Sequence, residues 1–268
     1  MDGTHAPPIV LSIAGYDPSS GAGITADIKT AASHGCYAVT CITALTVQST
    51  QGVKSVVTLN PELVKATLEE LAADVDLAAV RIGMLGSGPV ATAVADFLES
   101  AVPKHVVLDP VLSSSSGVEL LDQQGVTVLR ERLLRLAKVV TPNLNEAEAL
   151  TGMRVRNVDE MKAAALRLHE LGARGVVITG GHLAHPAELV SLEADSGRVQ
   201  KVLTGERIES RSTHGTGCAF AMALACNLAL GKQIGEAVAE TRDFVREAIS
   251  SAHPIGRGTG PLNLLLGR

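Results

Sequence analysis

The sequence has few aromatic residues, with no tryptophan, 2 tyrosines and 3 phenylalanines among its 268 residues. Proteins that bind single-stranded nucleic acid use aromatic side chains as platforms on which bases stack. The chain also lacks any block of Lys and Arg, and its 23 basic and 28 acidic residues give a net charge of −5. A nucleic-acid partner is therefore not expected.

Long apolar runs are also absent. The longest covers residues 219–226, far short of the roughly 18 residues that cross a bilayer, so no membrane span is expected. Residues 1–8 have neither the basic start nor the apolar stretch of a signal peptide, and we predict a short disordered tail there. The four cysteines form no C-x-x-C pair, which is typical of thiols in a reducing compartment. A cytoplasmic location is predicted.

The sequence does contain short β-branched runs that alternate with Ala- and Leu-rich stretches of helical period. The runs predict strands over residues 9–14, 38–47, 53–59, 78–82, 105–109, 138–141 and 175–179. The stretches predict helices over residues 22–33, 61–73, 89–101, 123–136, 146–150 and 159–171. Most of these strands are apolar on both faces, which is typical of a parallel sheet covered by helices on each side.

After residue 179 the pattern changes to a hairpin and two long helices. The hairpin strands are predicted over 188–193 and 198–203 with a turn at Asp195, Ser196 and Gly197, and the helices over 217–230 and 234–252. No repeat, linker or shift in composition marks a boundary. We therefore predict a single α/β domain over residues 9–268, with a mostly parallel central sheet.

Ligands in open α/β sheets gather where parallel strands end, so the loops that follow strands are candidate sites. Residues 15–23 (GYDPSSGAG) separate the first strand from the first helix, and their glycines would let backbone amides approach a ligand. An ordinary tight turn is the alternative. The G-x-G-x-x-G spacing of dinucleotide-binding proteins is incomplete here, which argues against a dehydrogenase.

A second glycine-rich loop, residues 213–218 (THGTGC), opens an apolar helix. Gly215 and Gly217 free the backbone, and the N–H groups of a first helical turn have no partner within the helix, so they converge on one point. That point suits an anion. The alternative is a glycine-rich cap for a buried helix, and the P-loop signature is absent.

Acidic and amide side chains follow two other strands. Asn143 and Glu146 lie three residues apart at a helix start, where they could order water around a magnesium ion or simply form a capping box. Asp109 ends an apolar strand, where it could lie near a metal-bound phosphate or cap the turn.

Other polar residues give weaker signals. His182 and His185 are three residues apart with no further ligand nearby, so a zinc site is not favoured. Met84 could belong to the core or to a pocket wall. Gln48 closes a long apolar strand, and its amide offers both a donor and an acceptor, although a surface glutamine is the alternative.

Seven segments, taken in order, resemble the hydroxymethylpyrimidine/phosphomethylpyrimidine kinases of thiamine biosynthesis, within the ribokinase-like superfamily. The segments are GYDPSSGAGITADIKT (15–30), ITALTVQSTQG (42–52), IGML (82–85), VLDPV (107–111), TPNLNEAEALTG (141–152), GGHL (180–183) and THGTGC (213–218). Together they extend over nearly the whole chain.

This resemblance implies a ribokinase-like fold, usually a homodimer, and two ATP-dependent phosphorylations. The first acts on the hydroxymethyl group of 4-amino-5-hydroxymethyl-2-methylpyrimidine, and the second converts the monophosphate to the diphosphate. By position, the resemblance implies that the aminopyrimidine is read by Gln48, helped by Ala22, Asp27 and Met84. It implies Mg²⁺ at Asn143 and Glu146, nucleotide contacts at Asp109, Asn143 and Thr216, and an anion hole over residues 215–218.

Cys218 stands where many ribokinase-like enzymes carry an aspartate base. A helix N-terminus favours the thiolate, so we expect a lowered pKa and hypothesise that Cys218 accepts the hydroxymethyl proton. The alternative is a small residue at a helix start.

The sequence departs from the family pattern at Tyr16, Ser20 and Thr25. Two lysines common in the family are replaced by Ser115 and Thr179, and Arg81 or Lys29 could compensate for the lost charge. Two alternatives therefore stay open. One is a pyridoxal or pyridoxine kinase of the same superfamily, and the other is a pyrimidine-binding module without turnover.

Overall fold

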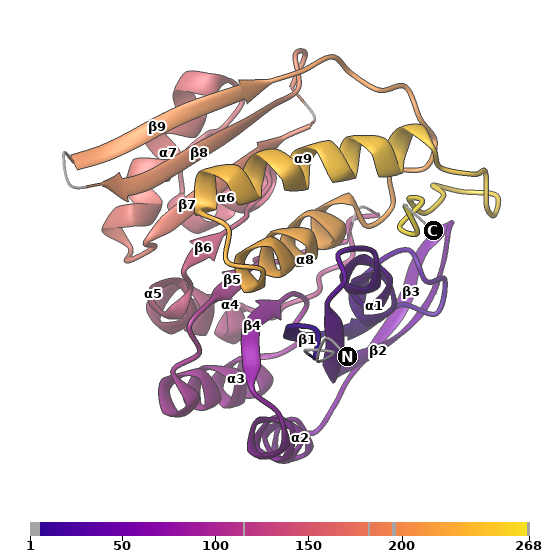
Figure 1. Cartoon of the computed structure of the whole chain (residues 1–268), viewed down its shortest axis with the longest axis vertical. Coiled ribbons are helices and arrows are strands. Elements are labelled where there is room, and N and C mark those ends of the chain that lie inside the picture. The colour runs from indigo at the N-terminus through magenta and orange to yellow at the C-terminus, as the bar shows by residue number, and fades with distance from the viewer. Residues whose placement is uncertain (1–5, 115, 182, 195–196, 267–268) are drawn as a thin grey trace, which may run out of the picture.

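The computed structural model describes residues 6–114, 116–181, 183–194 and 197–266. In this part of the chain, the strands form one nine-stranded sheet in the order β3-β2-β1-β4-β5-β6-β7-β8-β9 (Figure 1). The strands are β1 (Ile9–Tyr16), β2 (Tyr37–Ser49), β3 (Gly52–Thr58), β4 (Leu77–Ile82), β5 (Val106–Leu108), β6 (Val139–Val140), β7 (Gly175–Gly180), β8 (Ala187–Ala194) and β9 (Gly197–Thr204).

The middle of the sheet is parallel and its margins are antiparallel. Strands β2, β1, β4, β5, β6 and β7 run in the same direction, whereas β3 pairs antiparallel with β2. At the other margin β8 and β9 continue the sheet as an antiparallel hairpin. The predicted mostly parallel α/β sheet is confirmed.

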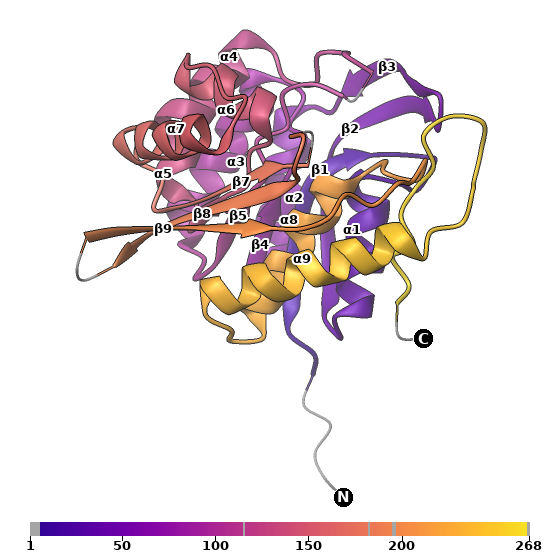
Figure 2. The same cartoon turned by 90° about the horizontal axis from the view of Figure 1, so that it is seen from above.

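Helices cover both faces of this sheet, as predicted (Figure 2). The helices are α1 (Gly23–Ser33), α2 (Pro61–Asp74), α3 (Gly88–Ala101), α4 (Gln123–Val128), α5 (Leu134–Leu136), α6 (Leu144–Thr151), α7 (Val158–Glu170), α8 (Thr216–Ala229) and α9 (Ile234–Ser250). One apolar core forms where α2, α3, α5, α6 and α7 meet the sheet, and a second forms beneath α1, α8 and α9. None of the helices in the described ranges is both long and apolar enough to span a membrane.

The alternation of side chains along a strand explains the two cores. In β5, Val106 and Leu108 belong to the first core, and Val107 between them belongs to the second. All three are at most 2% exposed, so this strand is buried on both faces. Such a strand requires apolar residues at every position, as its sequence has.

One sequence prediction needs adjustment, and two others fall partly on residues outside the described ranges. The helix predicted over 123–136 contains a π-helical segment, η1 (Leu129–Leu133), between α4 and α5. In the predicted hairpin turn, Asp195 and Ser196 lie outside the described residues, and Gly197 begins β9. Of the predicted tail, residues 1–5 lie outside the described part, and the carbonyl of Pro8 accepts a hydrogen bond from the N–H of Tyr37.

Candidate active site

The loop after β1 is organised by the carboxylate of Asp17. Its Oδ1 accepts hydrogen bonds from the N–H and hydroxyl of Ser19 at 2.8 and 2.7 Å, and its Oδ2 accepts from the N–H groups of Gly21 and Ala22 at 3.2 and 2.9 Å. Two of the amides expected to face a ligand therefore bind Asp17 instead. Ala22, predicted to contact substrate, is held in the loop by this bond.

His214 connects this loop to the second glycine-rich loop and to β2. Its Nε2 lies 2.8 Å from Asp17 Oδ2 and 3.1 Å from the amide nitrogen of Gln48. Burial alone would raise the pKa of Asp17, but the hydrogen bonds from His214 and Ser19 outweigh burial and lower it. Asp17 is therefore ionised at neutral pH and accepts from the Nε2–H of His214.

This arrangement leaves the amide of Gln48 weakly held. One ring nitrogen cannot both donate to Asp17 and accept from Gln48, so the short contact with Asp17 decides the proton position. The remaining contact of the Gln48 side chain is with the hydroxyl of Thr46 at 3.2 Å. Gln48 is half-buried and can exchange its contact with His214 for one with a ligand.

Gly215 is required where the two loops meet. It has a φ of +83°, and a Cβ at this position would lie 1.8 Å from the carbonyl oxygen of Gly21. Only glycine allows the backbones to approach this closely. Gly215 also precedes α8 without a side-chain cap, so the first-turn N–H groups are not occupied by a capping side chain, as the anion-hole prediction requires. Thr216 donates its hydroxyl to the carbonyl of Thr213 at 2.8 Å.

Asp109 lies beneath the start of α8. A Cβ at Gly217 would be 3.9 Å from Asp109 Oδ1. Burial raises the pKa of Asp109 against the opposing effect of Arg81. Burial and then the charge of Asp109 raise the pKa of Glu146 well above its ordinary value. Two carboxylates therefore share one poorly hydrated region at the carboxyl ends of β5 and β6.

The capping-box interpretation of Asn143 and Glu146 is confirmed. Asn143 N–H donates to Glu146 Oε2 at 2.8 Å, and Glu146 N–H donates to Asn143 Oδ1 at 2.9 Å. Thr179 lies alongside, since its N–H donates to the carbonyl of Pro142 at 2.9 Å. No group of three or more His, Cys, Asp or Glu that could hold a metal occurs among the described residues, so the protein alone does not form a complete metal cage.

A buried ion cluster lies under the two loops. The guanidinium of Arg81, on β4, donates to Asp27 Oδ2 at 3.0 Å and to Asp109 Oδ2 at 2.6 Å. Ser12 donates its hydroxyl to the same Asp27 oxygen at 2.5 Å. Gly83 makes room for this cluster, because a Cβ there would lie 2.2 Å from the guanidinium.

Asp27, predicted to help read the substrate, is thus one member of this buried cluster, and its Oδ1 has no hydrogen-bond partner among the described residues. Its side chain is fully buried and turned toward Ser12 and Arg81. Arg81 is equally buried and paired, so it is not a mobile cation that replaces the missing lysines. The other proposed replacement, Lys29, donates to the carbonyl of Ser20 at 2.9 Å. Ser115 and His182 lie outside the described residues.

The expectation of a lowered thiol pKa at Cys218 is wrong. Burial raises the pKa of Cys218 to about 11, and the charges of Asp109 and Asp27 act in the same direction. The guanidinium of Arg81 and the N–H of Gly23 favour the thiolate but are outweighed. The helix N-terminus considered from the sequence would lower the pKa of the thiol, but burial and the two nearby carboxylates have the larger effect.

Met84 and Gln48 lie on two sides of the first loop. Met84 is 8% exposed, and its sulfur would lie 2.8 Å from a Cβ at Gly15, so Met84 forms the base of the loop. Gln48 reaches His214, whose ring would contact a Cβ at Gly21. The predicted substrate residues Gln48, Ala22 and Met84 are thus brought to one region.

A family model described as phosphomethylpyrimidine kinase matches residues 17–263 of this chain. The chain belongs to the phosphomethylpyrimidine kinase family. It is 42% identical over 257 residues to the thiamine biosynthesis bifunctional protein ThiED of Geobacter sulfurreducens, covering 96% of this chain and 52% of that protein. The chain thus spans about half the length of that relative.

Two further similarities agree with this family. The hydroxymethylpyrimidine/phosphomethylpyrimidine kinase of Haemophilus influenzae is 41% identical over 258 residues, which cover 95% of each chain. The pyridoxal kinase from Staphylococcus aureus, solved in complex with ADP, has a TM-score of 0.88 and 31% identity, and the match covers 98% of this chain and 95% of that one. The resemblance and the ribokinase-like fold expected from it are confirmed.

Sequence reasoning left Asp17 and His214 out of the site, and it considered Arg81 only as a replacement cation. The sequence does contain patterns that indicate two of these roles. Arg81 is a charged residue inside the apolar run of β4 and must find a buried partner, and Asp17 begins an Asp-Pro-Ser-Ser-Gly segment, in which an Asp side chain commonly binds the backbone of a turn. The partner of each residue is supplied by a segment distant in the sequence, which the local pattern does not identify.

The ion cluster can be tested through the pKa of Asp27. Burial raises this pKa to about 6 from 3.8, so the folded state holds the proton more tightly than the unfolded state. The stabilisation by this proton is complete below pH 3.8 and is lost as the pH rises through 6, a change of roughly 3 kcal/mol in the free energy of unfolding. Asp27→Asn should remove this component, measured by urea unfolding at several pH values between 3.5 and 7.

Asp159→Asn is the matched control, because Asp159 is 90% exposed in its side chain and lies on α7. An Asp27→Asn protein with the same pH dependence as the wild type would contradict the raised pKa.

Proposed function

We propose that this protein uses ATP to phosphorylate the hydroxymethyl group of 4-amino-5-hydroxymethyl-2-methylpyrimidine and then the resulting monophosphate. The observation that carries the proposal is the 3.1 Å contact between Gln48 and His214. It joins the side chain suited to an aminopyrimidine edge with the loop suited to a phosphate. The family match over residues 17–263 supports the same reaction.

Substrate recognition rests on the weakly held amide of Gln48. An aminopyrimidine edge presents an exocyclic amine beside a ring nitrogen, which are one donor and one acceptor. The amide of Gln48 offers the complementary pair once it leaves His214. Met84, at the base of the Asp17 loop, supplies an apolar surface for the ring.

The phosphoryl group would lie at the amino end of α8. No side chain caps α8, and the N–H of Thr216 donates to the carbonyl of Thr213 at 3.4 Å. The N–H groups that follow it in the first turn are the donors proposed to stabilise negative charge as the phosphoryl group moves. Thr216 and Asp109 lie at the same place and Asn143 near the end of β6, so we assign these three to the nucleotide side.

The carboxylates present suit a magnesium ion. Mg²⁺ is usually bound through one or two carboxylates, several waters and substrate phosphates, so a complete protein cage is not required. Asp109 and Glu146 are buried acids, and the charge of Asp109 raises the pKa of Glu146, so a cation would favour both as carboxylates. When bound, the ion neutralises charge on the transferred phosphoryl group. Asp109 and Glu146, with Asn143, are the residues proposed to hold it.

A pyridoxal kinase is the principal alternative, because structural similarity to such a kinase is high. Identity favours the pyrimidine, at 41% to the Haemophilus kinase against 31% to the Staphylococcus pyridoxal kinase. The second alternative, a binding module without turnover, rests on the absence of lysine at Ser115 and Thr179.

A coupled assay of ADP release with both ring substrates separates these possibilities. We expect higher kcat/KM for the hydroxymethylpyrimidine than for pyridoxal. Tight pyrimidine binding without ADP production would support the binding module.

Gln48→Ala should weaken pyrimidine binding by roughly 1–3 kcal/mol and leave ATP binding unchanged, because a polar edge of the ligand is left unpaired. Gln123→Ala, an exposed amide at the start of α4, is the control.

The magnesium assignment is tested by Glu146→Gln. A glutamine keeps the capping box but supplies no charge, so the magnesium concentration for half-maximal activity should rise by about tenfold or more. Glu160→Gln is a matched control, because Glu160 lies three residues after the capping Asn157 of α7. Equal magnesium requirements in the two variants would leave Glu146 with a capping role alone.

A pH profile tests whether Cys218 is a base. A thiol with a pKa of about 11 is mostly protonated at pH 7, so the ionised fraction grows about tenfold per pH unit up to that value. If the thiolate accepts the hydroxymethyl proton, the first phosphorylation should accelerate with this slope between pH 7 and 9. Cys218→Ala should slow that step more than the second, whose monophosphate oxygen is already ionised. A flat profile in single-turnover assays would exclude the role.

We also propose a homodimer formed through the margin of the sheet made by β2 and β3. Leu45, Val47 and Val57 are 44%, 59% and 61% exposed, and Leu45 pairs directly with Val57 across the two strands. Such an apolar surface favours contact with a second copy. Val47→Lys together with Val57→Lys should convert the dimer to monomers in sedimentation experiments. Val199→Lys, at an exposed position on β9, should have no such effect, and a wild-type monomer would refute the proposal.

A further inference from the structure

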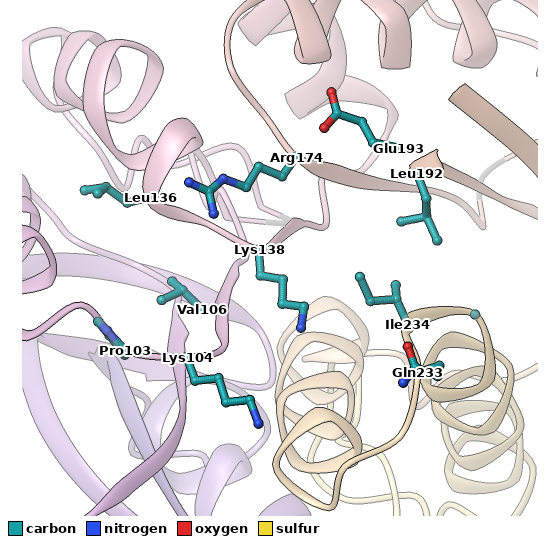
Figure 3. Close-up of a pocket in the computed structure, with 11 residues that line it drawn as sticks. Pro103, Lys104, Val106, Leu136, Lys138, Arg174, Leu192, Glu193, Gln233 and Ile234 are labelled. Carbon is teal, nitrogen blue, oxygen red and sulfur yellow. The ribbon is translucent and has the colours of Figure 1, made fainter. Parts of the chain in front are cut away.

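A groove of about 540 Å³ lies at the edge of the sheet opposite the candidate active site. Its lining comes from the amino ends of β5, β6 and β7, the end of β8 and the start of α9 (Figure 3). Lys104, in the groove, and Asp109, in the site, lie at opposite ends of β5 and five residues apart. This separation is roughly 16 Å in extended chain, so the groove is distinct from the site.

The groove has an excess of positive charge. Lys104, Lys138 and Arg174 line it, against the single carboxylate of Glu193. Figure 3 shows the Lys104 and Lys138 side chains extending in the same direction. Glu193 lies 3.9 Å from Arg198, and across the described ranges no carboxylate lies within 4.0 Å of the three cations. This excess contrasts with the net negative charge of the chain.

Lys104 and Lys138 influence each other electrostatically. Lys138 Nζ donates a hydrogen bond to His105 Nδ1 at 3.0 Å. The pKa of Lys138 is lowered by burial and then by the charge of Lys104, and the pKa of His105 is lowered by burial and then by both lysines. The like charges of Lys104 and Lys138 thus oppose each other across the groove, and a bound anion would offset this repulsion.

The rest of the lining suits a small organic molecule. Val106, Leu136 and Leu192 form an aliphatic surface beside the cations. On the other side, Gln233 precedes α9 without making a side-chain cap, so its first-turn N–H groups add donors for an anion. The volume falls within the range of sites for small ligands.

We propose that this groove is a second binding site, for a small phosphorylated molecule with two or more negative charges. The phosphate lies among Lys104, Lys138 and Arg174, and the organic part contacts the aliphatic surface. The site is independent of the proposed kinase reaction, because it shares no residue with it.

Inorganic pyrophosphate is the probe for the phosphate part, measured by isothermal titration calorimetry on the full chain with and without the nucleotide analogue AMP-PCP. The wild type should bind pyrophosphate in the presence of the analogue, with an affinity that falls as salt is added. Lys138→Gln combined with Arg174→Gln should weaken this binding by about 100-fold, since each charge-assisted interaction is worth roughly tenfold. Lys65→Gln on α2 removes one positive charge elsewhere, as the single variant Arg174→Gln does in the groove, and should change nothing.

Kinase activity and thermal unfolding of the double variant verify that it is folded, and Arg174→Gln alone, at an exposed position, provides a milder second variant. Equal pyrophosphate affinity in the wild type and both variants would overturn the proposal. So would a wild type whose pyrophosphate binding disappears once AMP-PCP is bound. If the analogue itself fails to bind, the proposed kinase function is in question, while the comparison of wild type with variants still tests the groove.

Discussion

The charge of Arg81 is the constraint on which the active-site edge depends. Its guanidinium is buried between Asp27 of α1 and Asp109 after β5, so one side chain fixes three elements relative to each other. Removing either partner would leave an uncompensated charge in the interior, which is strongly destabilising. The cluster also leaves Asp27 Oδ1 and Arg81 Nε without hydrogen-bond partners. We therefore infer that the cluster contributes more to the relative positions of α1, β4 and the end of β5 than to the free energy of folding.

Above this cluster, the two glycine-rich loops come together because glycine, which has no Cβ, stands where their backbones meet. Gly215 passes over Gly21 at a distance that a Cβ would prevent, and His214 then reaches both Asp17 and Gln48. Segments far apart in the chain thus form one surface, since Asp17 and His214 are 197 positions apart in the sequence. A single imidazole thus connects the residue proposed to read the ring with the loop proposed to hold a phosphate.

The parallel strands place different chemistry at their two ends. At the carboxyl ends, Asp109 and Glu146 gather negative charge near the start of α8, which has no side-chain cap. At the amino ends, Lys104, Lys138 and Arg174 gather positive charge next to α9. Two buried acids suit the magnesium ion proposed for phosphoryl transfer, whereas an excess of cations suits the anion proposed for the groove.

The sequence by itself determined the order of strands and helices along the chain, because apolar periodicity and turn residues act locally, and β5, for example, is apolar at every buried position. It also determined the family, through motifs such as residues 213–218. Only the tertiary structure decided that Asp27 faces Arg81, that Asp17 uses the loop amides, and that the pKa of Cys218 is raised. The physical reason is that burial and charge at a residue are set by neighbours far away in the chain, and a local pattern carries no information about them.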